Sequence, residues 1–258
     1  MRENKVLKTI VIFLLSHIPY RIAKELSRVS LKLIGVGRIA TIDEEVRTIL
    51  ELSKDCGEFD FLDIGANVGN YSLKINSTFP KLGIYAFEPS KSTFSTLVKN
   101  SESKGIHCFN TGFGEKAQIT NLYYDRAESG LASLSKRNLA HFNIDFDLSE
   151  EVQILTLDSW LATNNLRNNL VVKMDIEGHE FFALRGAKAA LETRIKVLQF
   201  EFGGANVSAG VFFIDIWSIL NKSHTIYRLT FTGLEAITDY TEDLENFLNT
   251  TYYAKSKV

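Results

Sequence analysis

The sequence FDFLDIGANVGNY at residues 59–71 decides the fold. Residues 59–64 form an apolar run typical of a buried strand, and the glycines after it indicate a turn that opens a helix at about Gly69. Asp63 stands at the carboxyl end of this predicted strand, where open α/β sheets bind ligands. Gly65 and Gly69 give the turn its backbone freedom at positions where a side chain would obstruct a ligand. The stretch predicts a strand–turn–helix unit that begins a nucleotide site.

A second predicted strand, at residues 82–87, ends in an acidic residue. Glu88 follows it directly, at the position where a doubly wound sheet holds ribose hydroxyls. An ionised carboxylate accepts two hydrogen bonds from a vicinal diol. The expected ligand therefore contains adenosine.

The composition of the turn discriminates between adenosine cofactors. A dinucleotide site favours glycine at the first, third and sixth positions of the turn, and counting from Gly65 the last two are Asn67 and Asn70. A cofactor without phosphates, such as S-adenosylmethionine, tolerates these side chains better. The alternative, a structural turn without a ligand, is disfavoured by the two carboxylates that accompany it. The predicted cofactor contacts are Asp63, Gly65, Asn67, Gly69, Asn70 and Glu88.

The composition is that of an ordinary globular chain. The 258 residues are 45% hydrophobic and 23% charged with a net charge of -2, which fits one α/β domain at residues 41–258 and an N-terminal helical extension at residues 1–40. The absence of a lysine or arginine block argues against nucleic-acid binding. Cys56 and Cys108 lack the spacing of a zinc site, and we expect reduced thiols in a cytoplasmic protein.

The N-terminal extension allows two interpretations. The apolar run at residues 6–15 is interrupted by Lys8 and Thr9 and is shorter than the ~20 residues that a membrane crossing requires. One interpretation is a helix packed on the domain or on a partner subunit, so an oligomer is an open alternative. The other is peripheral contact of residues 1–30 with the inner face of the membrane, where basic side chains would face lipid headgroups. These basic residues are Lys5, Lys8, Arg21, Lys24 and Arg28.

The remaining chain predicts a doubly wound, Rossmann-like sheet of seven strands with alternating helices. The further strands are expected at residues 106–111, 170–174, 195–202, 224–231 and 251–255, and the helices at 42–54, 90–103, 180–191 and 211–221. Residues 117–124 and 152–157 are expected as a strand pair added to the sheet edge. The polar connection between them, residues 125–149, has the length of a functional loop or lid.

Three blocks of sequence resemble the FkbM family of S-adenosylmethionine-dependent methyltransferases. They are FLDIGANVGNYS at 61–72, YAFEPS at 85–90, and TLDSWL with VVKMDIEGHEFFALRGA at 156–161 and 171–187. The last block is the most specific, since an apolar strand followed by K-x-D-x-E-G-x-E is not a general feature of nucleotide-binding folds. The resemblance runs from about Ile42 to the C-terminus.

The resemblance implies a class I methyltransferase fold, a cytoplasmic enzyme and O-methylation of a hydroxyl on a sugar, glycolipid, polysaccharide or related natural product. Asp63, Gly65, Asn67 and Gly69 match the first motif of the family, and Glu88 matches its ribose contact. The second motif is matched by Lys173, Asp175, Glu177, Gly178 and Glu180.

A sugar hydroxyl is a poor nucleophile at neutral pH, so a base or a metal ion is expected beside the methyl group. Asp175, at the tip of the strand at 170–174, is the first candidate for the base, and Glu177, His179 and Glu201 are further candidates. Lys173 completes the predicted catalytic set of Asp175, Glu177, His179 and Lys173. Mg²⁺ held by Asp175, Glu177 and Glu201 is an alternative.

Two other function classes stay open at this point. An NAD-dependent sugar dehydrogenase or epimerase is disfavoured by Asn67 and Asn70 and by the lack of a Tyr-x-x-x-Lys pair. A non-catalytic S-adenosylmethionine-binding subunit that docks a partner through the N-terminal helix would bind the cofactor without turnover.

Overall fold

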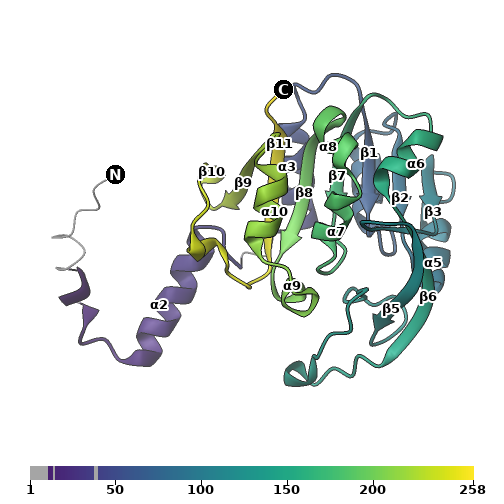
Figure 1. The fold of residues 1–258 in the computed structure, drawn as a ribbon. Coiled ribbons are helices and arrows are strands. Elements are labelled where there is room, and N and C mark those ends of the chain that lie inside the picture. Colours follow the sequence, from purple (N-terminus) through teal and green to yellow (C-terminus); the bar gives the residue numbers. More distant parts are fainter. Residues whose placement is uncertain (1–10, 14, 38–39) are drawn as a thin grey trace.

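The computed structural model describes residues 11–13, 15–37 and 40–258 (Figure 1). Within these residues the central sheet has eight strands. In spatial order they are β10 (Gly233–Ile237), β9 (His224–Thr230), β11 (Thr250–Ser256), β8 (Ile195–Phe202), β7 (Asn169–Met174), β1 (Phe59–Ile64), β2 (Ile84–Phe87) and β3 (Ile106–Phe109). The five strands from β8 to β3 are parallel, and β11, β9 and β10 pair antiparallel.

The order of the strands places a ligand site. β1 lies between β2 and β7. After β1 the chain adds β2 and β3 on one side of this strand, and it later returns to add β7 on the other side. Open α/β sheets bind ligands at such a reversal, outside the carboxyl ends of the strands. The predicted doubly wound fold is confirmed, with β10 as a strand that the sequence did not predict.

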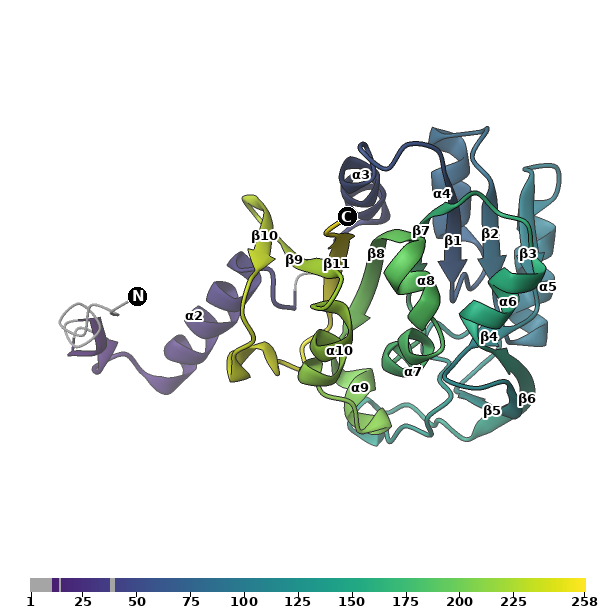
Figure 2. The same cartoon turned by 45° about the horizontal axis from the view of Figure 1, so that its top comes forward.

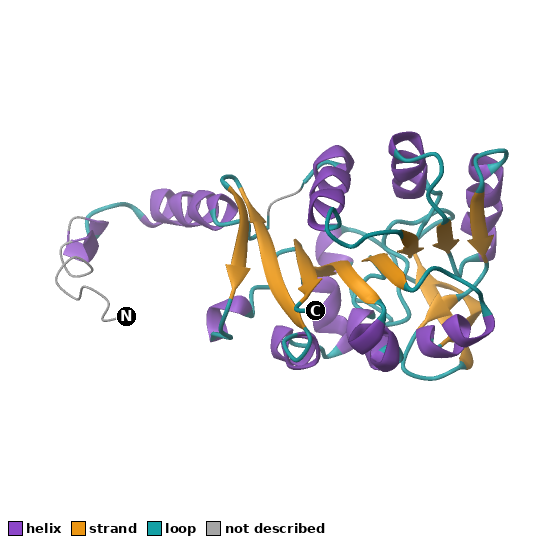
Figure 3. Cartoon of the chain, turned by 90° about the horizontal axis from the view of Figure 1, so that it is seen from above, coloured by secondary structure: helices purple, strands orange, loops and turns teal. Residues whose placement is uncertain are grey.

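Helices cover both faces of the sheet, as Figure 3 shows. One face carries α3 (Ile42–Leu52), α4 (Asn70–Thr78) and α5 (Lys91–Ser101), and the other carries α6 (Leu157–Thr163), α7 (Glu180–Arg185), α8 (Lys188–Thr193) and α10 (Phe213–Leu220). Because both faces are covered, the central strands are continuous apolar runs without alternation. The predicted capping box is present at the start of α3, where Thr41 and Glu44 each accept a hydrogen bond from the other's backbone N–H.

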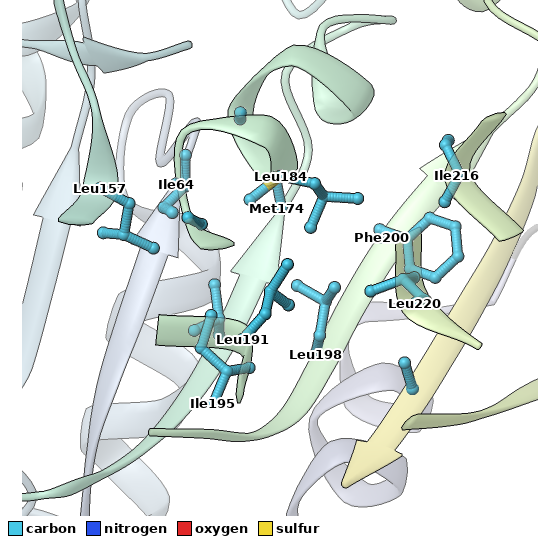
Figure 4. Packing of buried hydrophobic residues seen from close by; sticks show 14 of the residues in the cluster. Ile64, Leu157, Met174, Leu184, Leu191, Ile195, Leu198, Phe200, Ile216 and Leu220 are labelled. Carbon is cyan, nitrogen blue, oxygen red and sulfur yellow. The ribbon is translucent and has the colours of Figure 1, made fainter. Parts of the chain in front are cut away.

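The main hydrophobic core lies between the central strands and the helices α6, α7, α8 and α10. Figure 4 shows Met174 and Leu198 of the sheet facing Leu184, Leu191 and other helix residues of this cluster. A group of aromatic rings extends the core to the edge at β3. There the Trp160 ring of α6 packs edge-on against Phe87 and Phe109, with ring centroids 4.8 and 5.1 Å apart.

The predicted edge pair belongs to a separate sheet. β5 (Gln118–Tyr124) and β6 (Leu148–Leu155) pair antiparallel, and β6 also pairs with the short β4 (Gly112–Phe113), so the described residues contain a second sheet of three strands. The expectation that the pair extends the central sheet is therefore wrong. The small sheet lies beside the carboxyl ends of the central strands, as Figures 1 and 2 both show.

Two predicted helices differ from the observed ones. The helix expected at residues 180–191 is broken into α7 and α8 at Gly186, where an added Cβ would collide with the carbonyl oxygen of Gly114. The expected helix at 211–221 is α10, and a short helix, α9 (Gly204–Ala209), precedes it. Ser90 lies at the start of α5, but its hydroxyl donates to Glu150 and not to the helix backbone.

The N-terminal helix α2 (Tyr20–Leu33) projects from the edge of the molecule at β9 and β10, as Figures 1 and 2 show. None of its residues is buried, so its own domain does not cover the apolar side chains. Residues 1–10, including Lys5 and Lys8, lie outside the described part of the chain. In that part, no helix combines the length and the apolar character that crossing a membrane requires.

The aromatic cluster around Trp160 gives a test of the packing. Trp160→Ala should lower the free energy of unfolding by about 3–5 kcal/mol, because contacts with four aromatic rings are lost and the cavity closes only partly. Urea unfolding followed by circular dichroism measures this change, and Ile119→Ala, at an exposed position, is the control. A loss below about 1 kcal/mol would contradict the assignment of Trp160 to the core.

Candidate active site

A cavity opens at the carboxyl ends of β1, β2 and β7, beneath the small sheet and the loop at residues 125–149. Six of the predicted site residues line it: Gly65, Asn67, Glu88, Asp175, Glu177 and His179. The other predicted cofactor and catalytic residues do not. Lys173 and Asn70 line an adjoining hollow on the far side of the Gly65 turn, together with Glu45 of α3.

The Gly65 turn is shaped by the neighbouring strand. Gly65 has φ +80°, and an added Cβ would collide with the carbonyl oxygen of Asp175, so glycine is required by contact between β1 and β7. Asn67 is also left-handed, with φ 50°, and its backbone N–H donates to Glu88 at 3.0 Å. Gly69 begins α4 with φ 92°, and an added Cβ there would meet Leu97 at 2.8 Å.

Glu88 is buried at the tip of β2, with 6% of its surface exposed. Its two carboxylate oxygens accept from the backbone N–H groups of Asn67 and Ser90, at 3.0 and 2.9 Å. Burial raises the pKa of Glu88 to about 7, although these two hydrogen bonds act in the opposite direction. Each oxygen keeps a second lone pair, and the residue lines the cavity, so the carboxylate is available to a diol.

Asp63 is fully buried beneath the turn and does not line the cavity. It accepts a hydrogen bond from Ser72 at 2.7 Å and lies 3.5 Å from the ammonium group of Lys173. Lys173 in turn lies 3.3 Å from Asp175 and donates to the carbonyl of Gly65 at 3.4 Å. The structure therefore places Asp63 and Lys173 behind the site, where they hold its backbone.

Lys173 keeps its charge despite burial. Burial alone would lower the pKa of Lys173, but the carboxylates around it, of which Asp175 has the largest effect and Asp63 the next, raise the pKa above its ordinary value. The ammonium group also lies 5.4 Å from the centre of the Tyr71 ring. A charged Lys173 therefore fixes the position of Asp175 at the cavity wall.

Glu177 is bound by the loop that covers the site. Arg137 donates to its carboxylate at 2.8 Å, and Ser133 donates to its backbone carbonyl at 2.8 Å. Burial raises the pKa of Glu177 to about 7, the nearby charge of Asp175 adds to this rise, and Arg137 opposes it. The group therefore titrates near neutral pH at the cavity wall.

His179 lines the same wall as a neutral imidazole. Burial lowers its pKa to about 4, and its ring stacks on Phe182 with the centroids 4.6 Å apart. Within the described residues its Nδ1 atom is buried without a hydrogen-bond partner. A buried polar atom without a partner is costly, and binding of a ligand or a water at His179 would relieve this cost.

Two carboxylates of the predicted motifs hold the framework and lie outside the cavity. Glu180 is 1% exposed and accepts from the backbone N–H of Ile176 at 3.0 Å, which fixes the turn before α7. Glu201 accepts from the Asn249 side chain at 2.6 Å. The described residues contain no group of three or more histidine, cysteine or acidic side chains arranged to hold a metal ion, so the Mg²⁺ alternative has no support in this geometry.

The loop at residues 125–149 closes the cavity through residues that the sequence did not assign to the site. The side chain of Asn67 donates to the carbonyl of Ser129 at 3.1 Å, and Ser133 and Arg137 both bind Glu177. Ser129 and Ser133 belong to the segment SGLAS at residues 129–133. Its position in a long polar loop was the only signal in the sequence for these two serines. No local sequence pattern distinguished Arg137. Its side chain is 10% exposed, and it pairs with Glu177, which is distant in the chain.

The fold and the cavity define a Rossmann-like protein with a buried carboxylate at the tip of β2 and ionisable groups at the end of β7. A family model described as the methyltransferase FkbM domain matches residues 63–229. The chain belongs to this family and is an S-adenosylmethionine-dependent methyltransferase.

Two curated relatives are methyltransferases. The hexuronic acid methyltransferase AglP of Haloferax volcanii is 24% identical over 196 residues, which cover 76% of this chain and 75% of the relative. Methyltransferase 1 of Beauveria bassiana is 28% identical over 141 residues, or 48% of this chain and 57% of the relative.

Among solved structures, the FkbM methyltransferase from Methylobacillus flagellatus is 18% identical with a TM-score of 0.45, and the match covers 76% of this chain and 43% of that one. The match therefore spans less than half the length of that protein.

The residues present fit S-adenosylmethionine. Glu88 offers the buried carboxylate that ribose hydroxyls require, and the turn between Gly65 and Asn67 brings backbone to the cavity wall without a glycine pattern for phosphates. The carboxylates of Asp175 and Glu177 suit the positive charge of a sulfonium. Among the described residues, no lysine or arginine side chain lines the cavity to favour a pyrophosphate.

Glu88 gives a test of the cofactor site. Glu88→Ala should weaken S-adenosylmethionine binding at least tenfold, because two charge-assisted hydrogen bonds worth about 1.5–3 kcal/mol each are lost. Since the pKa of Glu88 is about 7, the affinity of the wild type should fall as the pH drops below 7, and that of the variant should change less. Titration calorimetry between pH 5.5 and 8.5 measures both, with Glu102→Ala, on the surface, as the control. Unchanged affinity in Glu88→Ala would reject the ribose assignment.

Arg137 gives a test of the loop. Arg137→Ala removes the charged contact to Glu177 while Ser133 stays in place, so residues 125–149 should exchange amide hydrogens faster and be cut sooner by protease. It should also raise the pKa of Glu177, since the guanidinium now holds that pKa down. Hydrogen exchange with mass spectrometry compares it with Arg126→Ala, whose side chain is exposed. Equal exchange in the two variants would show that Arg137 does not hold the loop.

Proposed function

We propose that this chain transfers the methyl group of S-adenosylmethionine to a hydroxyl of a sugar, free or carried on a glycolipid, a polysaccharide or a related natural product. The observation that carries the proposal is that one cavity is lined both by Glu88 and by Asp175, Glu177 and His179. The similarity to a hexuronic acid methyltransferase supports a uronic acid as the first acceptor to test.

S-adenosylmethionine supplies an electrophilic methyl group on a sulfonium, which leaves as a neutral thioether. The protein must orient that group, exclude water and take the proton of the acceptor hydroxyl. Glu88 would hold the ribose, which fixes the cofactor relative to β1 and β7. The loop at residues 125–149 would exclude water, since Ser129 and Arg137 tie it to the cavity wall.

Glu177 is the group that we assign as the base. A base works best when its pKa lies near the working pH, and the pKa of Glu177 is raised to about 7. Arg137 holds one carboxylate oxygen, so the other is free to accept the proton of the acceptor. Asp175, the first candidate from the sequence, is held by Lys173 at 3.3 Å, and its negative charge acts on Glu177. We assign Asp175 and Lys173 as positioning groups.

His179 would receive a hydrogen bond from the acceptor. Its imidazole is neutral at pH 7, and the Nδ1 atom has no partner among the described residues. The opposite wall is apolar and suits the C–H face of a sugar ring. It is formed by Phe113, Leu122, Leu134 and Ile154.

The test uses purified protein, S-adenosylmethionine and a panel of hexuronic acids and neutral hexoses, with mass spectrometry to detect the added methyl group. For an accepted sugar at saturating cofactor, kcat should rise with pH around a midpoint below 7, because Glu177 acts when deprotonated and a bound sulfonium would lower its pKa from about 7. Glu177→Gln should lower kcat by about 10²–10⁴-fold and remove this rise. Asp175→Asn should move the midpoint to lower pH, since it removes a charge that raises the pKa of Glu177.

Glu192→Gln, at an exposed position on α8, is the matched control and should behave as the wild type. Wild-type turnover by Glu177→Gln at pH 7 would exclude Glu177 as the base. Tight binding of S-adenosylmethionine without methylation of any sugar in the panel would instead favour the non-catalytic subunit.

A further inference from the structure

The helix α2 has two distinct faces. With 100° between successive residues, four apolar side chains fall within one narrow stripe and four basic side chains fall on the opposite side. The apolar stripe consists of Ile22, Leu26, Val29 and Leu33, and the basic face consists of Arg21, Lys24, Arg28 and Lys32. The helix carries a single acidic residue, Glu25, which pairs with Arg28 at 2.6 Å.

The apolar stripe is open to solvent in this structure. Its four side chains are between 50% and 56% exposed, and the preceding segment adds the exposed side chains of Val11, Ile12, Phe13 and Leu15. Figures 1, 2 and 3 agree that α2 and this segment extend away from the domain. An apolar surface of this extent on a projecting helix marks an interaction site.

The far end of α2 is fixed to the domain. Val36 is 2% exposed, and the backbone N–H of Gly37 donates to the Thr250 hydroxyl at 2.9 Å. Gly35, with φ +87°, lies so close to β9 that an added Cβ would collide with the carbonyl oxygen of Leu229. The direction in which α2 leaves the domain is therefore set by contacts with β9 and β11.

We propose that α2 binds the surface of a membrane rich in anionic lipids, with the apolar stripe inserted among the acyl chains and the basic residues among the headgroups. The choice of an anionic membrane as the partner rests on the charge of the helix. A chain with a net charge of -2 places four basic residues and one acidic residue on this single helix. Basic residues beside an apolar face are the signature of helices that lie in the plane of an anionic bilayer.

A second copy of the chain is a poorer partner for this surface. Packing two α2 helices through their apolar stripes would leave the basic face of each helix in solvent, so this contact would not neutralise the charge of the helix. An anionic bilayer neutralises the same charges and also accepts the apolar side chains of residues 11–15.

Membrane binding through α2 would attach the chain to lipid from the end of the sheet that carries the active site. Thr250, which receives the Gly37 hydrogen bond, begins β11 and pairs with Phe202, the last residue of β8. The helix is therefore attached at the end of the sheet where the parallel strands finish. Glu88, Asp175 and Glu177 lie at this same end. An acceptor sugar presented at a membrane surface would be reached from this end.

The experiment is flotation of the full chain with vesicles of phosphatidylcholine alone and with vesicles containing one third phosphatidylglycerol. The wild type should float with the anionic vesicles, bind neutral ones at least tenfold more weakly, and lose binding as salt is raised. Arg21→Gln with Lys24→Gln should lower partitioning about tenfold, and Leu26→Glu should lower it by at least as much. Circular dichroism and S-adenosylmethionine binding verify that each variant is folded.

Ile119→Glu is the matched control, because Ile119 is an exposed apolar residue on the domain, and it should bind vesicles as the wild type does. Equal binding by wild type and Leu26→Glu would overturn the proposal, as would binding to neutral vesicles that is independent of salt. A dimer in solution that Leu26→Glu converts to monomer, without vesicle binding by the wild type, would show that a second copy covers the stripe.

Discussion

The site depends on one buried charge, the ammonium group of Lys173. It lies 3.5 Å from Asp63 on β1 and 3.3 Å from Asp175 at the end of β7, and it donates to the carbonyl of Gly65 between them. A buried cation is stable only when it is paired and hydrogen-bonded, so these groups hold one another in position. The carboxyl ends of the neighbouring strands β1 and β7 are thus joined by ion pairs as well as by the hydrogen bonds of the sheet. The position of Asp175 at the cavity wall follows from this junction.

The sequence predicted the parts of the fold that local patterns determine. Strands β1 and β8 have the bounds that their apolar runs indicated, and the Thr41 capping box begins α3 as expected. Glu88 directly follows the short apolar run of β2, so a doubly wound fold places its carboxylate at the carboxyl end of that strand. Predicting these features requires only the hydrophobic pattern of the sequence and the general rule that open α/β sheets bind ligands at the carboxyl ends of their strands.

The sequence could not predict features that depend on contacts between distant residues. Gly186 looked like a tolerated glycine inside a helix, but the backbone of Gly114 passes so close that a side chain at this position would collide with it. Asp63 and Glu201 resemble site carboxylates, but Lys173 and Asn249 engage them outside the cavity. Arg137 reaches Glu177 across forty residues of chain, and its role becomes visible only when the loop is seen closed.

The charge of the buried carboxylates in the cavity depends on the charge of the ligand that binds beside them. The pKa values of Glu88 and Glu177 are both raised to about 7 because water is largely excluded from them, so at neutral pH each carries only part of its charge. A sulfonium beside Glu177 would stabilise the carboxylate form and lower that pKa, and the sulfonium is present only before methyl transfer. The thioether that remains is neutral and would leave the pKa high. The electrostatic attraction is therefore lost when the reaction is complete, which favours release of the demethylated cofactor over its retention.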